Sequence, residues 1–377
     1  MLSRRLQRTV TAEDAGLSRA PSTVSELIQE ADPLRRLSAL TRAELDPTRR
    51  HLLSSGLYSL AVLAAPEALQ PHRKPPAGPA GAPGRAGRAE VEEMQTMTRV
   101  FAEAAQAHGP GHVRTALAAY LGHDATGYLH ARATEDLHRQ LLSGAAQLTI
   151  LLGTMCADSG ADALAQRYHQ TGAQLSVEAG DASTLAIALR TMSAHAHDLG
   201  HRTPAVLNLA ERAATRETAP IVQAYAQAHL AVVQAHHDKH AALTALTSCE
   251  RLYEKAHTTP GPFTHYPVGA LHYQRAETLA ALGDQAGATR ALTASLRLRS
   301  PAEGQARTLT RARLAESLLG QGHLDAALTH WQTFLDEAPG LHSLRIGRCL
   351  DAMRRLLNPH RHHRATAQLL THAAALY

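Results

Sequence analysis

Histidine provides the densest set of side chains that could do chemistry in this sequence, with 25 among 377 residues. Two clusters contain His195, His197 and His201, and His236, His237 and His240. His236 and His240 would share one helix face, because residues four apart are neighbours on a helix. A closed zinc site needs four ordered ligands, and no cysteine or carboxylate spacing completes either cluster. We therefore expect no metal site and no cofactor.

The sequence also lacks the spacings that mark common catalytic sites. It contains no GxxxxGKS or GxxxxGKT phosphate loop, no HExxH, no GxSxG and no glycine run typical of a dinucleotide fold. Acidic and basic side chains occur throughout, but none can be assigned to catalysis without a fold that gathers them in one pocket. We expect a binding protein and not an enzyme.

The composition indicates which elements must position any binding residues. Apolar residues make up 44% of the chain and aromatic residues only 3%, and the apolar share is mostly alanine and leucine. These two residues lose little side-chain entropy in a helix, whereas the β-branched and aromatic residues that favour strands are scarce. The expected fold class is all-α.

Short turns of similar composition recur along the chain and indicate a helix-pair repeat. Their markers lie 40, 38, 45 and 39 residues apart, at Gly160, Gly200, Asp238, Gly283 and Gly322. Helix pairs repeated at such intervals are typical of an α-solenoid. The intervals exceed the ~34 residues of a standard tetratricopeptide unit, so we expect longer helices or loops.

The fifth unit, residues 311–339, carries the resemblance to tetratricopeptide repeats most clearly. Ala315 and Ala327 are small residues where two helices would cross, and Gly322 makes the turn between them. Trp331 and Phe334 would fill the groove between the helices. The same offsets give small residues in other units, at Gly153, Ala165, Ala276 and Ala288. The elongated units look like those of peptide-pheromone receptors of Gram-positive bacteria.

Three regions follow from the composition: an N-terminal helical segment at 1–65, a Pro/Gly-rich linker at 66–88, and the repeat domain at 89–377. In the first region we expect helices at Thr23 to Gln29 and Pro33 to Leu45, the second opened by Asp32. Arg49-Arg50 followed by apolar residues imitates an export signal, but 48 residues precede the pair, and we favour a short helix that docks on the array or lies in the linker.

Charge and cysteine usage narrow the classes of partner. Residues 1–88 hold 13 basic and 8 acidic residues, whereas the rest holds 25 of each, which argues against a nucleic-acid surface on the repeats. Six arginines between Arg345 and Arg364 are interpreted as a solvated helix face with a basic tail. Three widely spaced cysteines favour a reducing cytoplasm, and no apolar run reaches the ~18 residues of a membrane span.

Three stretches resemble actinobacterial regulators that join an XRE-type helix-turn-helix domain to a tetratricopeptide-like domain. They are LQRTVTAEDAGL at 6–17, DPTRRHLLSSG at 46–56, and the region 157–213, which contains ADSGADALAQRYHQTGAQLSVEAGD. The resemblance implies a transcriptional regulator. A DNA-reading domain would need ~55–65 residues ahead of Leu6. The resemblance therefore implies either a family member without that domain or the sensor part of a longer protein. DNA is a partner only if a helix-turn-helix is supplied upstream or by another protein.

The expected binding surface is the concave groove, lined by the first helix of each pair. Polar side chains spaced along these helices could contact an extended peptide, whose backbone offers a donor and an acceptor at each residue. Projection of the repeat register selects Gln147, Thr154, Asp158, Arg190, His197, Asp198, Gln227, Gln234, Tyr273, Glu277 and Glu316. We expect a peptide or protein ligand. Two alternatives stay open: a scaffold that assembles proteins without a DNA-linked function, and a homodimer.

Overall fold

The computed structural model describes residues 32–46, 58–60, 63, 84–256 and 263–375. Within these ranges it contains helices and no strand, which confirms the all-α prediction. The expected helix Thr23 to Gln29 and most of the linker lie outside the described residues. The expected helix at Pro33–Leu45 is present as α3, with Asp32 as its N-cap, since the Asp32 side chain accepts a hydrogen bond from the Leu34 N–H at 2.9 Å.

A helical block precedes the repeats and shares their core. It comprises α3, α5 (Arg88–His108), the short turn η3 (Pro110–His112), α6 (Arg114–Tyr120), the π-helical turn η4 (Leu121–Ala125) and α7 (Thr126–His130). Leu37 and Leu40 of α3 are buried in the same apolar cluster as Leu141 and Leu148. The block therefore packs against the first helix pair and closes that end of its core.

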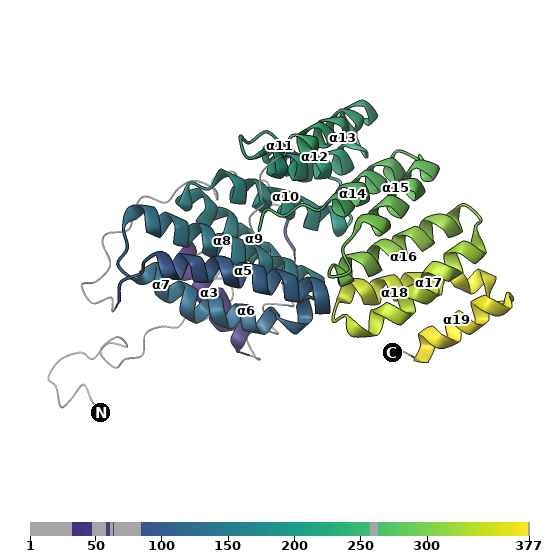
Figure 1. Ribbon diagram of the computed structural model, residues 1–377, viewed down its shortest axis with the longest axis horizontal. Coiled ribbons are helices and arrows are strands. Elements are labelled where there is room, and N and C mark those ends of the chain that lie inside the picture. The colour runs from purple at the N-terminus through teal and green to yellow at the C-terminus, as the bar shows by residue number, and fades with distance from the viewer. Residues whose placement is uncertain (1–31, 47–57, 61–62, 64–83, 257–262, 376–377) are drawn as a thin grey trace.

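The described part of the chain then forms six consecutive helix pairs, which follow an arc from teal to yellow in Figure 1. The pairs are α8 (Glu135–Asp158) with α9 (Asp162–Ala179), α10 (Ala182–Asp198) with α11 (Pro204–Ala214), α12 (Pro220–Gln234) with α13 (Lys239–Glu254), α14 (Val268–Ala281) with α15 (Gln285–Leu298), α16 (Gly304–Gly320) with α17 (Leu324–Glu337), and α18 (Leu344–Leu357) with α19 (Arg364–Ala375).

The five turns predicted from the sequence lie within the first five pairs. Gly160, Gly200, Gly283 and Gly322 all have φ between +75° and +89°, a conformation that residues with a Cβ rarely adopt. The remaining marker, Asp238, caps α13 by accepting hydrogen bonds from the N–H groups of His240 and Ala241. The repeat register is therefore confirmed.

Small residues stand at the helix crossings, as expected. A Cβ on Gly153 of α8 would lie 2.4 Å from Cδ2 of His169 on α9, so only glycine permits this approach. In the fifth pair Ala315, Ala327, Trp331 and Phe334 are fully buried. The ring centroids of Trp331 and Phe334 are 5.6 Å apart in an edge-on arrangement. The predicted packing of this unit is confirmed.

The sixth pair was not predicted. Its first helix, α18, buries Ile346, Leu350, Met353 and Leu357 on one side, at a helical spacing of three or four residues. The arginine-rich stretch is thus the polar side of an amphipathic helix that belongs to the array.

The array curves back on itself, so that its C-terminal part meets the helical block. The end of α5 lies beside α16 (Figure 1), and the residues just ahead of α18 contact it. The His342 N–H donates to the His108 carbonyl at 2.9 Å, and the Gly111 N–H donates to the His342 carbonyl at 3.1 Å. We call this contact between the α5–η3 end and the start of α16 and α18 the seam. It closes the helix pairs into a ring.

Helix α8 is the one described helix that is long and apolar enough to cross a membrane. However, 67% of its apolar stretch is buried within the protein. Such burial is expected of a core helix, because the same residues pack against α9 and the helical block.

Candidate functional site

A chamber of about 510 Å³ lies inside the ring. The first helices of five pairs line it, namely α8, α10, α14, α16 and α18, together with α5. Its volume is in the range of pockets that hold small molecules or short peptides, about 300–1,000 Å³. The inner face that the repeat register assigns to the binding groove is therefore hollowed next to the seam.

Six of the eleven predicted binding residues line the chamber. They are Thr154, Asp158, Arg190, Asp198, Tyr273 and Glu277. They come from α8, α10 and α14, three helices that together span more than a hundred residues of sequence. The repeat register thus brings together side chains that no local motif connects.

The other five predicted residues lie outside the chamber lining, and three of them bond within the helix array. The Gln147 amide donates to the Thr184 hydroxyl at 3.3 Å, across the first two pairs. Gln227 and Gln234 on α12 turn toward α11, where Gln227 donates to the Ala214 carbonyl at 3.5 Å. Gln234 donates to a Glu211 carboxylate oxygen at 3.4 Å. These two amides lie away from the chamber because they satisfy polar groups of the neighbouring helix.

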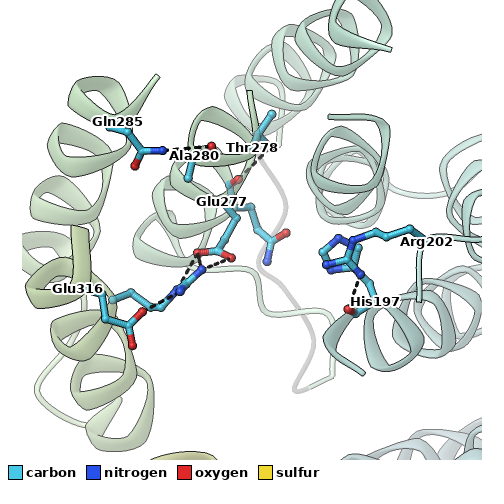
Figure 2. Close-up of polar contacts among 9 residues, drawn as sticks. His197, Arg202, Glu277, Thr278, Ala280, Gln285 and Glu316 are labelled. Carbon is cyan, nitrogen blue, oxygen red and sulfur yellow. Dashed lines mark hydrogen bonds and ion pairs between the residues drawn. The ribbon is translucent and has the colours of Figure 1, made fainter. Parts of the chain in front are cut away.

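His197 and Glu316 also lie outside the chamber lining, each in a different environment. The His197 ring lies 5.3 Å from the ring of His236 and 6.1 Å from that of His229. Burial, and then the positive charge of Arg202, lower the pKa of His197 to about 4, so the ring is neutral at neutral pH. Arg202 also donates to the His197 carbonyl (Figure 2). Glu316 is adjacent to the chamber through its ion pair with Arg313.

Arg313 on α16 was missed by the sequence analysis and organises one wall of the chamber. Its guanidinium donates to both carboxylate oxygens of Glu277, at 3.1 and 3.2 Å, and to Glu316 at 2.7 Å. These bonds join α14 to α16 (Figure 2). The Coulombic attraction of Glu277, which outweighs desolvation, raises the pKa of Arg313. Glu277 is therefore neutralised within the protein and is not a free acceptor.

Arg345 and Arg348 on α18 also face the chamber and were not predicted as binding residues. Both side chains are exposed, and neither has a hydrogen-bond or ion-pair partner among the described residues. They occupy the first turns of α18, where the helix dipole disfavours positive charge. Two unpaired guanidinium groups at this position form the positive side of the chamber.

Arg190 on α10 faces the chamber from the opposite part of the ring. Its guanidinium carbon lies 4.0 Å from the centre of the Tyr225 ring, a cation–π contact. Its buried Nε has no hydrogen-bond partner among the described residues. Arg190 is thus held in place by an aromatic ring while part of its donor capacity stays unused.

Acidic and imidazole groups complete the lining. The Asp162 carboxylate lies 3.0 Å from Nε2 of His195, and the His195 and His169 rings are 5.7 Å apart. Neither ring nitrogen of the buried His169 has a described partner. Burial, and then the nearby His195, hold the pKa of His169 well below its usual value. Asp198 is exposed to the chamber without a described partner.

Among the described residues, no group of three or more His, Cys, Asp or Glu side chains could hold a metal ion. Cys349 lines the chamber, and burial raises the pKa of its thiol to about 11. The thiol is therefore protonated at neutral pH and a weak nucleophile.

The arrangement can bind a ligand that presents both hydrogen-bond donors and acceptors. Unpaired guanidinium groups, an unpaired carboxylate and unpartnered imidazole nitrogens converge on one chamber from three of the helix pairs. The sequence offered no signal for Arg345 and Arg348 as binding residues, because α18 lacks the turn markers of the earlier units. No protein-family model, no curated protein and no solved structure matches this chain.

Proposed function

We propose that this protein is a regulatory binding protein whose chamber holds a short peptide or the end of a protein segment. The observation that carries the proposal is the convergence of unpartnered charged and polar groups on one chamber of about 510 Å³. Among these groups, Oδ2 of Asp158, Nε of Arg190 and both ring nitrogens of His169 are buried without a described partner. Such buried polar atoms are costly, and a ligand that supplies the missing bonds would remove that cost.

A peptide suits this chamber better than an apolar ligand. Its backbone carries a donor and an acceptor at every residue, and its carboxylates can accept from guanidinium groups. Arg345 and Arg348 offer such donors on α18, and Asp158 and Asp198 offer acceptors on α8 and α10. Leu151 and Leu309 add apolar surface for side chains.

The regulatory part of the proposal rests on the resemblance of residues 6–17, 46–56 and 157–213 to XRE-type regulators. In this view the repeat ring is a sensor, and a helix-turn-helix supplied upstream or by a partner contacts DNA. Sequencing the DNA ahead of the first codon tests whether a helix-turn-helix is encoded upstream. A gel-shift titration over a salt series tests DNA binding, because specific contacts outlast the salt-dependent attraction to phosphates.

Peptide binding is tested with the full chain and an equimolar pool of tetrapeptides, using native mass spectrometry to detect bound species. The decisive variant is Arg345→Ala, and the matched control is Arg355→Ala on the same helix, whose side chain is exposed and does not line the chamber. Loss of one charge-assisted hydrogen bond weakens binding by about tenfold or more.

The proposal predicts that Arg345→Ala lowers peptide occupancy by that factor and that Arg355→Ala leaves it unchanged. Equal occupancy in all three proteins would refute binding in the chamber. Stable capture of a protein partner that is insensitive to Arg345→Ala would instead favour the alternative of a scaffold that assembles proteins through its outer surface.

A further inference from the structure

Asp158 occupies the position where the chamber meets the seam. It is the last residue of α8, and its side chain is 6% exposed. Its Oδ1 accepts a hydrogen bond from the Ser343 hydroxyl at 2.9 Å and one from the Gln305 amide at 3.3 Å. Both donors belong to the C-terminal part of the ring, so Oδ1 helps to hold the seam closed.

The other oxygen of the same carboxylate is in a different situation. Oδ2 is buried and has no hydrogen-bond partner among the described residues, and Asp158 lines the chamber. Arg345 and Arg348 are near enough to act on it through their charge, but neither forms an ion pair with it. A buried carboxylate oxygen without a donor is costly, and a ligand N–H group in the chamber would remove that cost.

The seam itself is a built contact and not an incidental one. Cβ atoms on Gly109 and Gly111 would lie 2.7 and 3.0 Å from the backbone of His342, so these glycines permit the two backbone hydrogen bonds across the seam. The seam also contains stacked His112 and His342 rings, 5.9 Å apart. Because these contacts are non-covalent and join the two ends of the array, they can open without unfolding a helix pair.

We propose that Asp158 couples ligand binding to ring closure: Oδ1 holds the seam, and Oδ2 accepts a hydrogen bond from an N–H group of the peptide in the chamber. This inference rests on the proposed peptide-binding function. A ligand that binds Asp158 fixes its carboxylate in the orientation that receives Ser343 and Gln305. Closure of the seam then strengthens peptide binding by the same factor as the peptide strengthens closure.

The test is hydrogen exchange of the full chain, measured by mass spectrometry with and without the tetrapeptide pool. The amides of Gly111 and His342 report directly on the seam, because both donate across it. We expect saturating peptide to slow exchange in the segments around these amides by about tenfold, a typical strength of coupling between two sites.

Two variants separate the roles of the two oxygens. Asp158→Asn keeps one carbonyl oxygen for Ser343 and Gln305 but replaces the chamber-facing acceptor with a donor. Without peptide it should speed seam exchange less than Gly111→Ala does, because both seam donors keep an acceptor, and it should weaken peptide binding by about tenfold. Gly111→Ala strains the seam outside the chamber lining. It should speed exchange at His342 and weaken peptide binding by a similar factor through the coupling.

The outcomes distinguish this inference from the function on which it rests. If no tetrapeptide binds the wild-type chain, the proposed function fails. If peptides bind but leave seam exchange unchanged, the function stands and the coupling is refuted. If Asp158→Asn binds peptides as tightly as the wild type, Asp158 is not a ligand contact. Comparing free with N-acetylated tetrapeptides shows whether the donor is the terminal ammonium or a backbone amide.

Discussion

Replacing Gly153 with alanine adds a single methyl group at the closest approach of α8 and α9. The new Cβ would lie 2.4 Å from Cδ2 and 2.7 Å from Nε2 of His169, and 3.1 Å from Cβ of Tyr168. His169 is 1% exposed, so its ring has no free volume to move into. Cβ of Tyr168 is bonded directly to the α9 backbone and moves only with the helix. The two helices must therefore separate.

The size of the effect follows from two opposing terms. Alanine is favoured over glycine inside a helix by about 0.5–1 kcal/mol. Overpacking a filled core costs about 1–3 kcal/mol, so Gly153→Ala should lower the free energy of unfolding by up to about 2.5 kcal/mol. Gly347→Ala is the matched control, since a Cβ on Gly347 in α18 meets nothing within 4 Å. It should raise the free energy of unfolding by about 0.5–1 kcal/mol.

Urea unfolding followed by circular dichroism measures both changes, as shifts of the midpoint at constant slope. The two variants should move the midpoint in opposite directions. A Gly153→Ala protein as stable as Gly347→Ala would refute the close crossing of α8 and α9, and with it the assignment of small residues to helix crossings. A changed slope in either variant would show that the substitution altered how cooperatively the array unfolds.

Further predictions concern buried groups. Trp331→Ala removes a fully buried ring and should lower the free energy of unfolding by about 3–5 kcal/mol in urea titrations. A loss below about 1 kcal/mol would contradict the burial of this ring. Glu44→Gln removes the 2.8 Å ion pair between Arg114 and the Glu44 carboxylate, which is 1% exposed. It should lower the free energy of unfolding by about 3–5 kcal/mol at neutral pH. Burial is the main cause that holds the pKa values of His169 and His229 well below their value in the unfolded chain. The stability that their neutral rings contribute should therefore be fully present above about pH 6.5 and decline below it. Between pH 7.5 and 5.5 each contributes a loss of roughly 1 kcal/mol, which a flat unfolding profile would contradict.

The repeat architecture could be predicted because local chemistry encodes it. Glycines such as Gly160 and Gly322 are needed where φ is positive, and Asp238 caps the helix that follows its turn. Small residues at helix crossings, such as Gly153, reflect a steric limit that acts between neighbouring helices. Each signal lies within one helix pair, so the sequence reveals it.

The chamber could be predicted only in part, because its closure depends on the sum of rotations between successive pairs. No local signal shows that α5 meets α16, or that Asp158 bonds to Ser343, 185 residues away. Thr154 and Arg190 line the chamber because they come from regular units. Gln227 lies outside it because its amide bonds to the preceding helix, a choice that the repeat register does not determine.

The central claim, that a peptide binds inside the ring, is tested most directly by alkylation of Cys349. This thiol lines the chamber, whereas the thiols of Cys156 and Cys249 are buried and should react only on unfolding. N-ethylmaleimide in mildly alkaline buffer should modify Cys349 first. The tetrapeptide pool should slow this reaction, and Arg345→Ala should remove the protection. Equal rates of Cys349 modification with and without the pool would contradict that claim.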